Sequence, residues 1–71
     1  MKVRLEEIGK ALMALREEKG MTRKQLAIKA GVSLTRVKWY ELNHEVPAFD
    51  TVVRVLSALG YDVRILERRK K

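Results

Sequence analysis

Side chains that can donate hydrogen bonds to phosphate groups gather in the middle of the chain, between residues 23 and 43. Arginine, lysine and asparagine, together with the hydroxyl residues, are the usual donors to phosphate oxygens and to base edges. The formal net charge of +7, from sixteen Lys and Arg against nine Asp and Glu, also favours a polyanionic partner. The candidate donors are Arg23, Lys24, Ser33, Thr35, Arg36, Lys38 and Asn43.

Other chemistry is poorly represented. The chain has no cysteine, which excludes a disulfide. Because His44 is its single histidine, we also expect no structural zinc site. No cluster of carboxylates forms a recognisable catalytic site, so we expect neither an enzyme nor a cofactor. No apolar run approaches the roughly 18 residues of a membrane span. Glu6 and Glu7 interrupt the apolar region that a signal peptide would need. We therefore expect a cytoplasmic protein without a membrane partner.

The elements that position the donors begin with a helix predicted over residues 3–18. Its apolar residues recur at helical spacing, and Gly20 is a suitable stop after it. This periodicity predicts one face turned to a core. The apolar stripe consists of Leu5, Ile8, Leu12 and Leu15.

The first central helix is predicted over residues 22–29. Thr22 is a good N-cap, and Gln25 three residues later completes a capping box. Gly31 can take a positive φ at no steric cost, which predicts a tight turn.

A second central helix is predicted over residues 33–42, capped by Ser33 and ended by Asn43 in the left-handed conformation. At about 100° per residue, Val37 and Tyr40 fall on one side of this helix. The opposite side, which we expect to face outward, carries Thr35, Lys38, Trp39 and Leu42.

The last helix is predicted over residues 48–59, with a broad apolar face and a poorly capped start at Ala48. After it, Tyr61, Val63 and Ile65 alternate with polar residues, which is typical of a strand. A lone strand on a helical domain leaves its backbone unpaired, so its natural partner is the same strand of a second copy.

The stretch from Ile8 to Gly60 resembles the lambda-repressor-like, Cro/C1-type (XRE) helix-turn-helix domains. The matching residues read LREEKGMTRKQLAIKAGVSLTRVKWYELN and then PAFDTVVRVLSALG. The resemblance implies an all-α, compact four-helix lambda-repressor-like domain that binds double-stranded DNA. The alternating pattern after it adds a short C-terminal β-strand that pairs across a homodimer. We therefore divide the chain into a DNA-binding domain over 1–60 with its motif at 23–42, a dimerising strand over 61–66 and a basic tail over 67–71.

The same resemblance implies roles for individual residues. Arg16 and Glu41 stand at positions that often form a partly buried ion pair in the family. The chain departs from the family at Arg23 and Leu34, where glutamine is usual, and at Trp39, where a smaller or polar residue is more common. We expect base contacts from Leu34, Thr35, Lys38 and Trp39, phosphate contacts from Arg23, Lys24, Ser33, Arg36 and Asn43, and a dimer interface at Tyr61, Val63 and Ile65.

Together these patterns predict a sequence-specific transcriptional regulator, namely a repressor that binds a pseudo-palindromic operator as a homodimer. One alternative is an antitoxin that neutralises a toxin protein and represses its own operon. The segment ALGYDVRI is similar to a subset of the family found in autoregulating antitoxins. A second alternative is a protein-binding adaptor that uses the fold without reading DNA.

Overall fold

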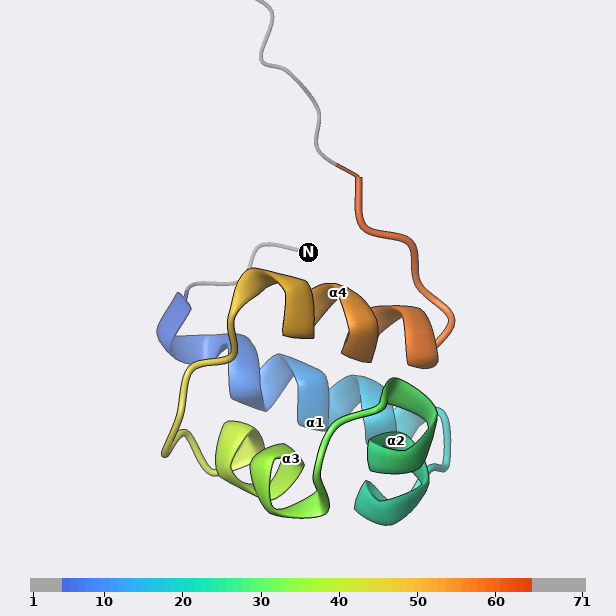
Figure 1. Ribbon diagram of the computed structural model, residues 1–71, viewed down its shortest axis with the longest axis horizontal. Coiled ribbons are helices and arrows are strands. Elements are labelled where there is room, and N and C mark those ends of the chain that lie inside the picture. Colours follow the sequence, from blue (N-terminus) through green and yellow to red (C-terminus); the bar gives the residue numbers. More distant parts are fainter. Residues whose placement is uncertain (1–4, 65–71) are drawn as a thin grey trace, which may run out of the picture.

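Four α-helices and one 3-10 turn make up residues 5–64, the part of the chain that the computed structural model describes. Within these residues the all-α prediction is confirmed, because no strand is formed (Figure 1). The elements are η1 (Leu5–Glu7), α1 (Ile8–Glu18), α2 (Arg23–Ala30), α3 (Leu34–Glu41) and α4 (Phe49–Ala58).

The first helix starts later than its periodicity predicted. A 3-10 turn occupies Leu5–Glu7, and the α-helical stretch begins at Ile8. Glu7 is the N-cap residue and makes no side-chain capping bond, so no polar side chain fixes the helix start. Residues 3 and 4 of the predicted helix lie outside the described residues.

The start of α2 follows the capping pattern of the sequence. The backbone N–H of Gln25 donates to the Thr22 hydroxyl at 3.0 Å, and the Thr22 N–H donates to Gln25 Oε1 at 2.8 Å. This reciprocal pair confirms the predicted capping box. At the other end, Gly31 adopts φ 71°, the left-handed conformation that the tight turn requires.

Both ends of α3 also match their sequence signals. The Arg36 N–H donates to the Ser33 hydroxyl at 3.1 Å, which caps the helix start. After the helix, Asn43 is the one non-glycine residue among 5–64 with a positive φ, at 62°. A polar side chain tolerates this conformation better than an apolar one. The chain therefore turns away from α3 at the predicted place.

The core lies where all four helices meet. In Figure 1, α4 runs along the top, α1 crosses the middle, and α2 and α3 form the lower side. Helix α3 packs against α1 and α2, and α2 also packs against α4. The buried apolar residues of this cluster are Leu12, Leu26, Ala27, Ala30, Val37, Val55, Ala58 and Leu59.

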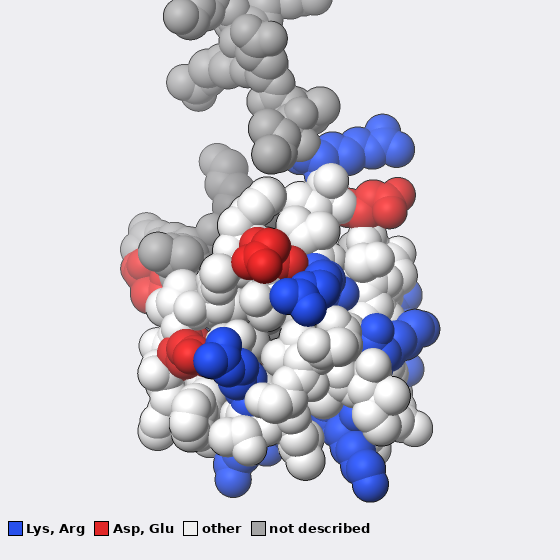
Figure 2. All heavy atoms as spheres, viewed as in Figure 1, with Lys and Arg blue, Asp and Glu red and all other residues white. Residues whose placement is uncertain are grey.

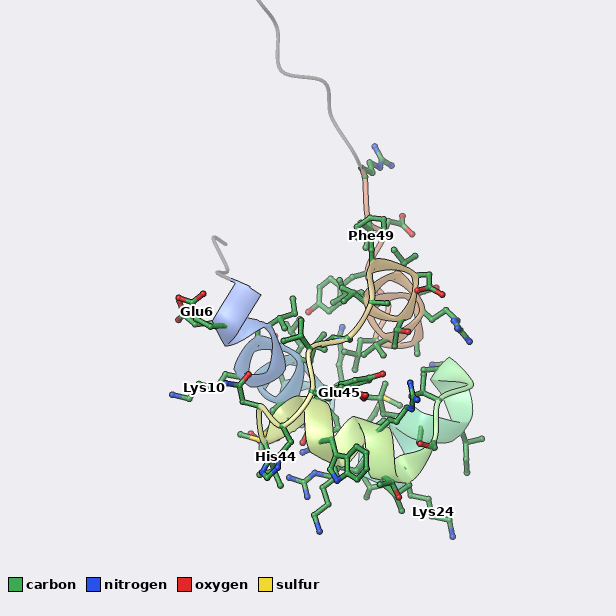
Figure 3. All side chains as sticks on the ribbon, turned by 60° about the vertical axis from the view of Figure 1, so that its left-hand side comes forward. Glu6, Lys10, Lys24, His44, Glu45 and Phe49 are labelled. Carbon is green, nitrogen blue, oxygen red and sulfur yellow. The ribbon has the colours of Figure 1, made fainter. Side chains whose placement is uncertain are left out.

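The predicted apolar face of α4 is buried over only part of its length. Val55 and Ala58 are buried in the second half of the helix. Phe49 is the first residue of α4 and is 61% exposed, because it lies beyond the edge of the core (Figure 3). Helical spacing alone therefore overstated how far this helix is covered by the rest of the chain.

Helices α1 and α3 approach so closely at Gly9 that no side chain fits there. A Cβ added to this buried glycine would overlap the carbonyl oxygen of Tyr40, near the end of α3. The clash is with backbone, which cannot swing aside as a flexible side chain would. Gly9 therefore sets the distance between the two helices, a role that the periodicity of α1 did not predict.

The chain leaves the helical body after Gly60, which has φ 91°. Tyr61 is half-buried: its ring packs against the core, and the ammonium of Lys19 lies 5.0 Å from the ring centroid. Residues 61–64 form no strand in the single chain. Ile65 and the predicted tail over 67–71 lie outside the described residues, so the pairing of two strands stays a prediction.

Replacement of Gly9 by alanine is expected to destabilise the domain by about 1–3 kcal/mol, because the new methyl group overpacks the α1–α3 contact. Equilibrium urea unfolding followed by circular dichroism measures this loss. The control is Ala14→Gly, at an exposed site of the same helix, which reports the helix-propensity difference alone, about 1 kcal/mol. A higher unfolding midpoint for Gly9→Ala would contradict the close approach.

Candidate nucleic-acid interface

The side of the domain built from α2 and α3 carries exposed cations and no exposed carboxylate. Between residues 22 and 44 the only acid is Glu41, which is buried. Figure 2 shows Lys and Arg, and no Asp or Glu, along the lower edge of the visible face, where Figure 1 places these two helices. A surface of this kind attracts a polyanion. The exposed cations of α2 and α3 are Lys24, Lys29, Arg36 and Lys38, of which Lys29 lies toward α4.

Helix α3 separates a core side from an outward side, as its helical angles predicted. Val37 and Tyr40 are buried, whereas Thr35, Lys38 and Trp39 are exposed. The helix thus presents a hydroxyl, an ammonium and an indole to the outside. With side chains, an α-helix is roughly 10–12 Å across, which is the width of the major groove of B-DNA.

The outward side of α3 is also unusually apolar. Leu34 is 47% exposed, Trp39 is 45% exposed and Leu42 is 47% exposed. Apolar side chains in the major groove contact the methyl group of thymine, which is the one apolar feature of a base edge. This surface therefore suits contacts with thymine as well as hydrogen bonds from Thr35 and Lys38.

The expected phosphate donors flank α3. Lys24 and Arg36 are exposed on α2 and α3, and Asn43 is exposed just after α3. In Figure 3 the side chains of Lys24 and His44 project from the lower side of the domain, one on each side of α3. The Ser33 hydroxyl already accepts a bond from the Arg36 N–H, but a hydroxyl can still donate its own proton.

Arg16 and Glu41, which the family resemblance paired, form a buried ion pair between α1 and α3. Arg16 Nε donates to Glu41 Oε2 at 2.6 Å, and Arg16 Nη2 donates to Glu41 Oε1 at 3.1 Å. Arg16 Nη1 donates to the carbonyl oxygen of Met21 at 2.7 Å. The hydrogen bond to Glu41 raises the pKa of the Arg16 guanidinium, because it favours the charged form of this group.

Arg23 makes a contact that the sequence patterns did not indicate. Its Nε donates to Glu41 Oε1 at 2.8 Å, although its side chain is 34% exposed. Arg23, the expected phosphate donor at the start of α2, is thus also the second arginine that binds the buried carboxylate of Glu41. The sequence feature that could have indicated this contact is that Glu41 is the only acid in the cationic stretch 22–44.

The described part of the chain contains neither a metal site nor a membrane-spanning helix. Among residues 5–64, no group of three or more His, Asp or Glu side chains is arranged to hold a metal ion. The helices in this range are also too short and too polar to cross a lipid bilayer.

Comparison with known proteins agrees with this geometry. The family model described as Helix-turn-helix matches residues 12–66, which include α2, the turn at Gly31 and α3. The chain therefore belongs to the Cro/C1-type (XRE) helix-turn-helix family. No curated protein and no solved structure matches the chain.

Membership defines the function at the level of the family. The protein is a DNA-binding transcription regulator, and families of this kind are generally not enzymes. The helix-turn-helix of α2 and α3 lies on the side whose exposed charges are all positive. The residues expected to touch DNA are thus located on the element that this family uses for that purpose.

Proposed function

We propose that this protein is a transcriptional repressor that binds a pseudo-palindromic operator as a homodimer. The observation that carries the proposal is the outward side of α3, which offers Thr35 and Lys38 beside exposed apolar groups on a surface without exposed carboxylates. Such a helix can enter the major groove without repelling the phosphates on either side of it.

In this proposal α3 reads bases while α2 and the flanking loops hold the sugar-phosphate backbone. Thr35 and Lys38 donate to base edges, and Leu34 and Trp39 contact thymine methyl groups. Phosphate contacts fix the register of the domain and carry no sequence information themselves. They come from Arg23, Lys24, Ser33, Arg36 and Asn43.

The homodimer follows from the segment after α4. Val63 is exposed in the single chain and alternates with Asp62 and Arg64, which supports an edge strand that pairs with its own copy. Tyr61 contributes less to such an interface than its spacing suggested, because its ring already packs on the core of its own chain. A twofold dimer places the two copies of α3 on half-sites roughly 34 Å apart.

Repression requires no further activity of the chain. A dimer seated on an operator covers the groove and the phosphates over about two half-sites and so excludes other proteins from that stretch. An antitoxin would have a toxin protein as a second partner. Co-purification of this chain with a protein encoded by a neighbouring gene would reveal such a role.

Selection of bound duplexes from a random pool at moderate salt is expected to yield a palindromic consensus with half-sites about one helical turn apart. Thymine-rich steps are expected within each half-site because the reading side is apolar. The control pool is selected with the Lys38→Ala variant. Recovery of unenriched sequences by the unaltered protein would instead favour nonspecific binding or a protein-binding role.

Lys38→Ala is expected to weaken binding to the selected duplex by about 1–3 kcal/mol, the usual contribution of one good base contact. The fold is expected to persist, because Lys38 is exposed and alanine favours the helix. Fluorescence anisotropy with a labelled duplex measures the change. Lys10→Ala is the matched control, since Lys10 is an exposed lysine that projects from α1 away from the lower side (Figure 3). Equal affinities for both variants would contradict the assignment.

Val63→Asp is expected to weaken dimerisation at least about tenfold, because each interface would bury two unpaired carboxylates in place of two valine side chains. Sedimentation-velocity analysis across a concentration series measures the monomer–dimer equilibrium. Asp62→Ser alters the neighbouring residue, which alternation places on the opposite face of the strand, and is expected to leave the equilibrium unchanged. A tight dimer in the Val63→Asp variant would place the interface elsewhere.

A further inference from the structure

Glu41 binds one arginine more than its burial requires. Its side chain is only 1% exposed, and Arg16 alone supplies an N–H group to each of its two oxygens. The Arg16–Glu41 pair is therefore neutral and hydrogen-bonded without a third residue. Arg23 adds a second donor to Oε1 and brings the charge of the cluster to +1.

The excess charge lies at the surface and not in the core. The Arg23 side chain is 34% exposed, three times the exposed fraction of Arg16 at 11%. Among residues 5–64, the Arg23 side chain donates a hydrogen bond only from Nε, to Glu41. Its two terminal nitrogens make no hydrogen bond to these residues. A guanidinium held by Nε still has the edge formed by these two nitrogens, which matches a phosphate group with two parallel hydrogen bonds.

The location of Arg23 also disfavours a purely structural role. It is the first residue of α2, directly after the Thr22 cap, where the helix dipole opposes a positive charge. Lys24 follows it and is exposed. Two cations at this helix start are stabilised by an anion placed beside them, and Glu41 itself is already neutralised by Arg16.

We propose that Glu41 is a positioning residue: it clamps Arg23 by Nε and thereby presents the terminal N–H groups of Arg23 to one DNA phosphate beside α3. This inference rests on the proposed DNA-binding function. Because Glu41 is the last residue of α3, the clamp couples the backbone contact made from α2 to the position of the reading helix. The side chain is ordered before DNA arrives, so binding does not have to immobilise it.

The clamp requires arginine and not merely a positive charge. Lysine has a single ammonium group, which can face Glu41 or the phosphate but cannot present a planar fork to both. Lys10 on α1 is exposed and lies outside the proposed DNA interface, so lysine and arginine are equivalent there (Figure 3). The pair of charge-conserving exchanges, Arg23→Lys and Lys10→Arg, thus separates the clamp from net charge.

The test measures the affinity of the full chain for the selected duplex as a function of salt concentration. The proteins compared are the unaltered protein, R23A, R23K, K10R, E41Q and the double variant R23A/E41Q. We expect R23A to weaken binding and to lower the slope of log affinity against log salt by about 0.9, the value for one lost phosphate contact. R23K is expected to bind about two- to tenfold more weakly than the unaltered protein, whereas K10R is expected to bind with unchanged affinity.

A thermodynamic cycle tests whether Glu41 acts through Arg23. E41Q is expected to weaken binding about two- to tenfold in the unaltered background and to have no further effect in the R23A background. Circular dichroism defines a temperature at which each variant is folded. If E41Q does not fold at any temperature, the comparison of R23K with K10R decides alone, because neither exchange removes the Arg16–Glu41 pair.

Two results would overturn the clamp while leaving the DNA-binding function intact: R23K with the affinity of the unaltered protein, or an equal loss from E41Q with and without Arg23. Absence of duplex binding by the unaltered protein would overturn the proposed function itself and the clamp with it. The two failures are therefore distinguishable in one set of titrations.

Discussion

The arrangement of the helix-turn-helix depends on one buried negative charge, the carboxylate of Glu41. A buried ion without a partner costs several kcal/mol, so the fold is stable only when the carboxylate is bound. Arg16 comes to it from α1 and Arg23 from the start of α2, while Glu41 itself ends α3. A single ionic cluster therefore ties three helices together. The cluster constrains α3 at its C-terminal end, whereas the Ser33 cap constrains the other end.

Helix α3 has eight residues and is far too short to be stable alone in water. Its existence depends on packing, and the packing is unusually close: Gly9 lets the backbone of α1 touch the carbonyl oxygen of Tyr40. On the inner side, Val37 and Tyr40 join the core. Because the inner side is held this tightly, the outer side can be devoted to Lys38 and Trp39 without loss of the fold. The core residues and the exposed residues proposed to contact DNA thus lie on opposite sides of the same short helix.

Residues 61–64 lie away from the side of the domain formed by α2 and α3. In Figure 1 the chain leaves the end of α4 on the upper side of the domain, while α2 and α3 lie on the lower side. A dimer formed through residues 61–66, as we propose, would therefore leave both copies of α3 free to face DNA. Tyr61 packs on the core and lies beside the ammonium of Lys19, so the start of this segment is held against the helical body.

The sequence by itself determined the four helices, the caps of α2 and α3, the turn at Gly31 and the two sides of α3, because capping and helical angle are local properties of neighbouring residues. Only the tertiary structure decided that Gly9 sets the α1–α3 distance, that Phe49 lies outside the core, and that Arg23 binds Glu41. Each of these depends on which surfaces meet across elements far apart in the chain. The local sequence pattern specifies which side chains lie on each face of a helix. Which residues those side chains contact is decided only by the packing of the whole domain.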